Sequence, residues 1–171
     1  MLKYAKIINN ETGLCEVGLG TNIEFYKSQG FELLDIEQSE IDNLWYTAEK
    51  CPHKSDEQLL EEAKENKIKE NDTKRDEALN GGVEYKNILF DSDTDQKVNL
   101  LATVSTMDEE ATIVWFGMDN TPLECTKEDL INIGGLITQL HSFCWSKNAE
   151  IKSLINEAQT IDEVNEVEIL Y

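Results

Sequence analysis

The sequence predicts an α+β protein with a small hairpin-containing N-terminal module, a polar linker helix, and a C-terminal α+β domain with a long heptad-patterned helix. Three observations support this prediction. Short apolar runs alternate with turn residues near the start of the chain, residues 53–80 contain neither proline nor glycine, and apolar residues recur at steps of three and four from position 130 to 158. We therefore expect an adaptor module at 1–52, a charged linker helix at 53–80, and an α+β domain at 81–171.

The N-terminal module is expected to begin with a β-hairpin, because two apolar runs flank the turn-rich residues 9–13. Thr21 or Asn22 can then cap a short helix. Gly30 can end that helix in a left-handed conformation. The expected elements are, in order, strands at 4–8 and 14–19, a helix that ends at Gly30, and short strands at 31–36 and 45–47.

Residues 53–80 are expected to form one long, polar helix. Ser55 and Gln58 form a capping box at its start, and Gly81-Gly82 ends it. Its apolar residues are too few to bury one face along the whole length. So polar a helix is usually a spacer or one strand of an oligomeric coil, and we therefore expect it to be the domain boundary.

The C-terminal domain is expected to contain two hairpins before its longest helix, one around Lys86-Asn87 and one around residues 118–120. Between them, Thr94 or Asp95 can cap a helix. Residues 167–171 are compatible with a last strand. The inward face of the middle helix is expected to consist of Val98, Leu101, Val104 and Met107.

The longest helix is expected to begin at Thr126, with Asp129 completing a capping box. Its heptad spacing indicates that it packs lengthwise on another helix, either within the fold or across an oligomer axis. Gly134-Gly135 costs about 2 kcal/mol relative to alanine unless close backbone packing compensates, so we expect a tight helix crossing or a bend there. The seam consists of Leu130, Ile133, Ile137, Leu140, Cys144, Ile151, Leu154 and Ala158, and Lys147 interrupts it.

The composition restricts the partners that the chain can bind. The 171 residues include 15 Lys plus Arg and 35 Asp plus Glu, a formal charge of −20. Such a charge repels phosphate backbones and anionic lipid, so we expect neither nucleic acid nor membrane as a partner. No stretch approaches the roughly 20 apolar residues that cross a bilayer, and the first residues lack the apolar centre of a signal peptide. We therefore expect synthesis and folding in the cytoplasm.

The cysteine and histidine residues do not predict a metal site. The four cysteines lie far apart in the sequence, so we interpret them as reduced thiols. Cys51 and His53 flank Pro52, and His141 and Cys144 have the i, i+3 spacing of a helix face. Both spacings are compatible with metal binding, but neither pair matches a zinc-finger pattern. We expect these residues to be ordinary buried or linker residues, and we expect no cofactor.

Other motifs also favour a structural interpretation. Asp91, Asp93 and Asp95 copy the first alternate carboxylates of a calcium loop, but the glycine and glutamate that must follow are absent. No motif nominates a catalytic residue, so we expect a protein that is not an enzyme. The three tryptophans suggest either core anchors or a carbohydrate platform. Trp145 lies off the seam and is the best candidate for a contact between subunits or domains.

A set of residues between positions 74 and 168, over half of the chain, follows a family pattern. The set consists of Tyr85, Phe90, Asp95-Gln96, Asn99-Leu100, Val114-Trp115, Asp119-Asn120, Leu123, Thr126, Asp129-Leu130, His141, Lys152, Ile155, Ala158 and Thr160. With these residues the chain resembles the family of a domain of unknown function numbered 4376, which is carried by phage and prophage tail-fibre and tail-fibre-assembly-like proteins.

The N-terminal region is similar to a module of short proteins that are encoded beside tail-fibre genes in prophages of Gram-positive bacteria. The residues concerned are Tyr4-Ala5-Lys6-Ile7, Val17 to Asn22, Phe25-Tyr26, Asp35, Glu37-Gln38 and Trp45-Tyr46. Together the two resemblances imply a virion component near the baseplate or tail fibres. They imply that the chain is in the bacterial cytoplasm during assembly and in a phage tail or tail-like particle afterwards.

The expected function is therefore that of a non-enzymatic structural protein that acts by protein–protein contacts. The expected partners are fibre or baseplate subunits, with a homo-oligomer also open. An assembly chaperone that leaves before the particle is finished is the first alternative, and a carbohydrate-binding module at a fibre tip is the second. The candidate interaction residues are Leu130, Ile133, Ile137, Leu140, Trp145, Ile151 and Leu154.

Overall fold

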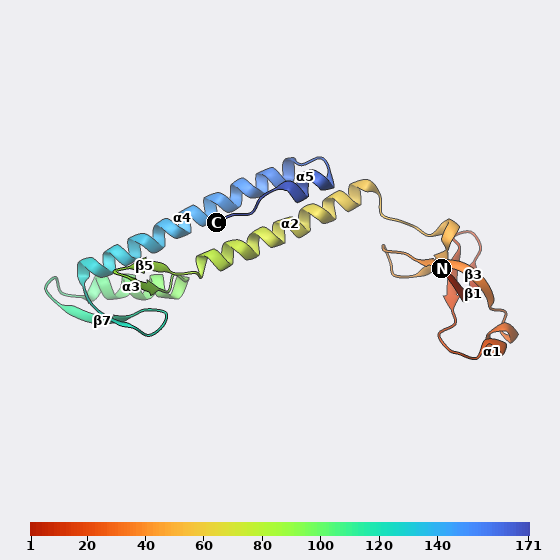
Figure 1. Cartoon of the computed structure of the whole chain (residues 1–171), viewed down its shortest axis with the longest axis horizontal. Helices are drawn as coiled ribbons and strands as arrows, with labels where there is room; N and C mark the ends of the chain where they lie inside the picture. The colour runs from red at the N-terminus through yellow and green to blue at the C-terminus, as the bar shows by residue number, and fades with distance from the viewer. The chain divides into compact units, whose positions relative to one another are not determined.

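The computed structural model describes residues 1–171, and the chain divides into two compact units, Met1–Leu59 and Leu60–Tyr171 (Figure 1). Both units combine helices with antiparallel strand pairs. The predicted α+β class is therefore confirmed. None of the helices combines the length and the apolar character that crossing a bilayer requires.

The first unit is a small closed barrel of antiparallel strands in the order β1-β2-β4-β3. The predicted hairpin is confirmed, with Ala5 opposite Val17. Ala5, Cys15 and Ile36 are buried inside the barrel, and Trp45 packs against them. The elements are β1 (Leu2–Asn9), β2 (Leu14–Val17), α1 (Ile23–Ser28), β3 (Glu32–Gln38), β4 (Trp45–Thr47) and the 3-10 turn η1 (Ala48–Lys50).

The short helix α1 has both of the predicted end signals. The Asn22 side-chain oxygen accepts a hydrogen bond from the Phe25 N–H at 3.1 Å. Gly30 has a φ of +81°, a conformation that residues with a Cβ seldom adopt. The chain then enters β3, so these two residues set where the helix begins and ends.

The second unit is built on the longest helix, α4, which Figure 1 shows in light blue. The predicted first hairpin is confirmed, and Lys86 and Asn87 have φ angles of +51° and +62° as a type I′ turn requires. The unit's elements are most of α2 (Asp56–Leu79), β5 (Val83–Tyr85), β6 (Ile88–Phe90), α3 (Thr94–Thr106), β7 (Thr112–Phe116), β8 (Pro122–Thr126), α4 (Lys127–Glu157) and α5 (Ile161–Glu166).

The α4 seam is buried within the unit, in two successive apolar clusters. Its first half joins the core formed with the two hairpins and α3, and its second half packs against α2 and α5. The predicted seam residues up to Cys144, and Ile151 and Ala158 after it, pack in the core, whereas Leu154 does not. The buried positions that the prediction missed are Asn148 and Ile155. Leu154 is 49% exposed. The next seam position after Cys144 is Asn148, four residues further on. Because asparagine is polar, the spacing of apolar residues alone did not reveal this position.

Two predictions for α3 were wrong. Its N-cap is Asp93, whose carboxylate accepts a hydrogen bond from the Gln96 N–H at 2.7 Å, rather than Thr94 or Asp95. The inward face contains Leu100, with Val104 and Met107, whereas Val98 and Leu101 are exposed. Four residues at constant steps of three rotate around a helix by about 180°, because each step falls short of a turn of 3.6 residues. The predicted set could therefore not share one face.

Helix α2 packs along α4 although its sequence is polar. The Ser55–Gln58 capping box is confirmed by hydrogen bonds of 2.9 and 3.2 Å. We expected residues 53–80 to be a linker helix. The chain from Leu60 onward instead belongs to the second compact unit. Leu60, Ala63 and Ile68 contact the second cluster of α4. Lysine and arginine side chains extend this inner face, because their aliphatic stems cover apolar surface while their charges reach water.

The C-terminal segment is irregular rather than the strand that we predicted for residues 167–171. Its apolar residue Ile169 is buried in the second cluster of the seam. The Tyr171 hydroxyl donates a hydrogen bond to the side-chain oxygen of Asn71 at 2.6 Å. The end of the chain therefore packs between α2 and α4, as Figure 1 shows.

Asp129 joins the start of α4 to the first hairpin. Its carboxylate lies 2.7 Å from the Lys86 ammonium, accepts the Tyr85 hydroxyl at 2.8 Å, and accepts the Thr126 N–H at 3.0 Å. The predicted capping box is thereby confirmed. The Lys86 ammonium, the Thr126 N–H and the Tyr85 hydroxyl, in that order, hold the pKa of Asp129 well below its usual range.

The buried seam predicts a clear contrast between two isoleucines of α4. Ile137 is completely buried and Ile131 is mostly exposed. Replacing Ile137 with alanine should lower the free energy of unfolding by about 2–5 kcal/mol, because it leaves a cavity. Ile131→Ala should change it by less than about 0.5 kcal/mol. Urea unfolding followed by circular dichroism measures both values, and equal losses would show that the seam is not the core.

The contacts of Asp129 predict a specific dependence of stability on pH. Since its folded pKa is lowered, its stabilising contribution is complete above the ordinary carboxyl pKa of about 4 and is lost as the pH falls through the folded pKa. Asp129→Asn should lower stability at pH 7 and weaken the loss below pH 4. Asp108→Asn, which makes the same change at an exposed aspartate, is the matched control. Urea titrations at several pH values decide this, and identical acid profiles for wild type and Asp129→Asn would contradict it.

Candidate functional site

Two neighbouring hollows follow one face of α4. Gly134, Thr138, His141 and Trp145 are spaced by four, three and four residues, which places them on the same side of the helix. Each hollow has a volume of about 490 Å³. The α3–α4 groove is lined by Lys97, Leu100, Leu101, Val104, Leu130, Ile131, Gly134, Gly135, Thr138 and Gln139. The Trp145 pocket is lined by Asp76, Leu79, Asn80, Asp93, Thr94, Asp95, His141 and Trp145.

The α3–α4 groove has apolar walls that the chain leaves open to solvent. Leu101 on α3 is 70% exposed and Ile131 on α4 is 53% exposed. They are exposed because Leu100 and Leu130, one residue before each, enter the core, and successive residues of a helix point about 100° apart. The groove therefore presents large apolar side chains from two rigid helices.

The glycine pair forms part of this open surface. We expected a tight helix crossing or a bend at Gly134-Gly135. Instead α4 continues through them, and a Cβ built at either position would meet no atom within 4 Å. Neither the bend nor a tight crossing within the chain is present at the glycines, because α3 contacts α4 through the neighbouring Leu100 side. The helix thus carries a cost of about 2 kcal/mol that no contact at the glycines themselves offsets.

The Trp145 pocket is acidic and has an aromatic wall. The Arg75 guanidinium lies 4.3 Å from the centre of the Trp145 ring and pairs with Asp76 at 2.7 Å. His141 Nε2 lies 2.7 Å from the Ser92 carbonyl oxygen, which fixes the imidazole at the pocket edge. Asp93 caps α3 and is held there. The pocket therefore offers an aromatic face and carboxylates, which together suit a cationic side chain.

The structure separates the predicted interaction residues into two groups. Leu130, Ile133, Ile137 and Ile151 are completely or almost completely buried in their own unit, and Leu140 is half-buried against the first cluster. The question left open by the sequence is therefore answered for these positions, because their seam faces the chain's own core. Trp145 and Leu154 are 54% and 49% exposed.

The sequence did not indicate the walls of the α3–α4 groove. Ile131 directly follows the seam residue Leu130 and is not part of the heptad pattern. Leu101 belongs to the predicted inward face of α3. The available signal was an apolar residue beside the seam, close to two glycines on the same helix. Such a combination predicts an apolar helix face with an accessible backbone.

The other two tryptophans pack against apolar cores, and the cysteines are buried. Trp115 packs against the first core cluster, and Trp45 packs on the barrel core with the Lys3 ammonium 4.0 Å from its ring centre. All four cysteines are free and buried. Burial raises the pKa of each thiol above its ordinary value, so these thiols stay protonated near neutral pH.

Comparison with known proteins gives one match. No curated protein and no solved structure matches the chain. The sequence profile of a family described as "Domain of unknown function (DUF4376)" matches residues 62–169. The matched segment contains every residue that lines the α3–α4 groove and the Trp145 pocket. The match also includes most of α2, whereas the resemblance seen in the sequence begins at about residue 74. Because the match covers more than half of its length, the chain belongs to the DUF4376 family.

Proposed function

We propose that the chain is a non-enzymatic structural component of a phage or phage-tail-like particle, and that it binds a neighbouring subunit through the α3–α4 groove. One observation supports the proposal that this groove binds another protein. Large apolar side chains border a glycine pair that nothing in the chain covers. Contiguous exposed apolar surface of this kind marks sites of protein–protein contact.

The chemistry of the groove specifies the occupant. Its apolar walls and accessible backbone fit an apolar helix that packs closely over Gly134 and Gly135. The Trp145 pocket begins roughly two helical turns, or about 11 Å, further along α4. It presents Asp76, Asp93 and Asp95. The partner is therefore an apolar helix of another protein with a lysine or arginine about two turns beyond its apolar residues.

The charge of residues 81–171 supports the same kind of partner. Residues 81–171 contain 5 basic and 17 acidic residues, a net charge of −12. A field of this sign attracts a basic partner and increases its association rate, whereas it repels a second acidic copy. A neighbouring protein of complementary charge is therefore favoured over self-association through this face.

The placement in a tail particle rests on the sequence resemblances at both ends of the chain. The C-terminal residues resemble those of tail-fibre-associated proteins that carry this domain, and the N-terminal residues resemble a module encoded beside tail-fibre genes. A tail-fibre assembly chaperone would use the same groove, but transiently. The two roles differ in whether the chain remains in the finished particle.

The glycine pair predicts opposite effects on stability and on binding. Gly134→Ala and Gly135→Ala should each raise the free energy of unfolding by about 1 kcal/mol, because alanine is the better helix former and its Cβ meets no neighbour. Gly134→Leu should leave the chain folded while filling the groove. Denaturant unfolding measures the first effect, and destabilisation by Gly134→Ala would contradict the open groove.

The effect on binding is measured in particles that the host produces with Gly134→Leu in place of the wild-type chain. Mass spectrometry of purified particles should find the chain lost or at least tenfold depleted, since the added side chain occupies the partner's place. Ser146→Leu adds the same side chain at an exposed position of α4 outside the groove and should have no effect. Normal incorporation of Gly134→Leu would refute the groove as the contact.

The same measurement on wild-type particles separates the component from the chaperone. A structural component should be present in purified, complete particles at a fixed ratio to the fibre or baseplate proteins. If the chain is found with tail proteins in lysates but is absent from complete particles, the component role is refuted and the chaperone role is supported.

A further inference from the structure

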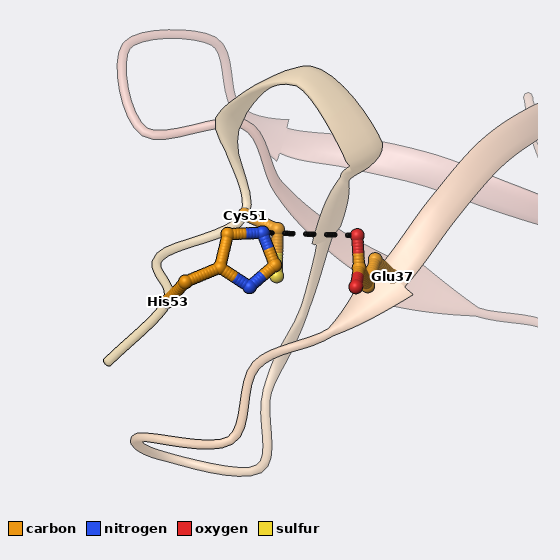
Figure 2. A group of neighbouring side chains, drawn as sticks. All are labelled: Glu37, Cys51 and His53. Atoms are coloured by element: carbon orange, nitrogen blue, oxygen red, sulfur yellow. Dashed lines mark ion pairs between the residues drawn. The ribbon is translucent and has the colours of Figure 1, made fainter. Parts of the chain in front are cut away.

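Three potential metal ligands of different chemistry converge in the first unit. Glu37, Cys51 and His53 each offer one ligand atom, and these atoms all lie within 4.8 Å of one another. Figure 2 shows the three side chains directed toward a common point, with the Glu37–His53 ion pair drawn as a dashed line. None of these residues takes part in the groove of the second unit.

The barrel holds these three residues in place. Glu37 lies on β3 opposite Tyr46 of β4, and the chain returns through η1 to reach Cys51. The buried Ser39 hydroxyl donates a hydrogen bond to the Pro52 carbonyl at 2.9 Å. That bond ties the Cys51–His53 segment to the end of β3. The fold therefore brings the backbone positions of Glu37, Cys51 and His53 close together.

The contacts of the cluster do not explain it as an ordinary ion pair. His53 Nε2 and Glu37 Oε2 are 3.9 Å apart, which is too long for a hydrogen bond. An exposed pair at that distance contributes little to stability. Cys51 is buried beside them and lies outside the apolar cluster at the centre of the barrel. The arrangement of sulfur, nitrogen and oxygen atoms thus has no evident role in packing.

The distances fit a small tetrahedral ion after minor side-chain rotation. Zinc binds thiolate at about 2.3 Å, imidazole at about 2.0–2.1 Å and carboxylate at about 2.0–2.2 Å, so its ligand atoms lie roughly 3.3–3.7 Å apart. Each pair of atoms needs to approach by about 1.5 Å at most. The side chains of His53 and Glu37 are 56% and 48% exposed and can make that movement.

The surrounding charge also favours a cation. The carboxylates of Glu37, Asp42 and Glu40 act electrostatically on the Cys51 sulfur. The same negative potential that disfavours a bare thiolate attracts a divalent ion. A bound ion then compensates both the thiolate and the Glu37 carboxylate.

We propose that Glu37, Cys51 and His53 bind one zinc ion, with water in the fourth position. Zinc is the cation of choice because a mixed thiolate, imidazole and carboxylate set matches its preferences, whereas magnesium and calcium take oxygen ligands. On binding, the Cys51 thiol releases its proton to solvent and the sulfur bonds to zinc. The ion links the end of β3 to the segment after η1, so it stabilises the barrel.

The test uses the full chain, stripped of metal with a chelator and then titrated with zinc or with cobalt as a spectroscopic probe in excess magnesium. One zinc per chain should bind and raise the melting temperature, since ligand that binds only the folded state stabilises it. Cobalt should give a thiolate-to-cobalt charge-transfer band. Cys51→Ser should abolish that band, and His53→Ala and Glu37→Gln should weaken binding by more than about tenfold.

The controls separate this site from general binding to an acidic surface. Glu32→Gln makes the same chemical change on the same strand and should leave zinc affinity unchanged. Because His53 and Glu37 are exposed, their variants report on binding even if Cys51→Ser does not fold. The proposal is overturned if no zinc binds with magnesium in excess, or if zinc binds equally to wild type, His53→Ala and Glu37→Gln.

Discussion

A layer of buried polar side chains fixes how α2 and α4 lie against each other, and the second unit depends on that register. Asn71 on α2 is completely buried and Asn148 on α4 is 4% exposed, in the seam between the two apolar clusters. The Asn71 amide donates to the Asn148 carbonyl at 3.3 Å, and Tyr171 donates to Asn71. A shift of α2 by one turn would leave these groups unpaired at about 1–3 kcal/mol each. Apolar contacts alone would tolerate such a shift, so the asparagines provide the specificity.

Charged side chains extend this layer toward solvent and connect it with the Trp145 pocket. Asp72 accepts a hydrogen bond from Asn148 at 3.0 Å and pairs with Lys152 at 2.7 Å and with Arg75 at 2.8 Å. Lys152 and Asn148 together hold the pKa of Asp72 below its ordinary value against the opposing effect of burial. Arg75 then stacks on Trp145. The interaction that fixes the helix register therefore also orients the aromatic wall of the pocket.

Local signals in the sequence predicted most elements of the fold, because each depends on a few neighbouring residues. The capping boxes at Ser55 and Thr126 and the turn at Lys86-Asn87 are of this kind. Two of the failures concern which face of a helix is buried, a property decided by distant partners. Asn148 hid the seam because a polar residue occupies an apolar position, and Leu101 was assigned inward because regular spacing does not reveal which stripe meets the core.

The same limit explains why the candidate sites were missed. Glu37 is 14 residues from Cys51 in sequence, and only the pairing of β3 with β4 brings the two together. Cys51 and His53 alone have spacing that is common without a metal, so the sequence favoured the simpler interpretation. In the groove, the glycine pair predicted a tight helix crossing or a bend, and no segment of the chain makes such a crossing. A local pattern can thus specify a kind of contact while leaving the identity of the contacting segment undetermined.

Folding and binding in the second unit use different sides of one helix. The buried side of α4 carries the seam, and its loss would unfold the unit. The groove side carries Ile131, which is mostly exposed, and the two glycines Gly134 and Gly135, where a Cβ would meet no neighbour. Because α4 remains helical without help from its glycines, their cost of about 2 kcal/mol is offset by the seam rather than by local packing. A stable core is therefore what permits an accessible backbone on the adjacent side of α4, where a partner helix can approach more closely than any larger residue would allow.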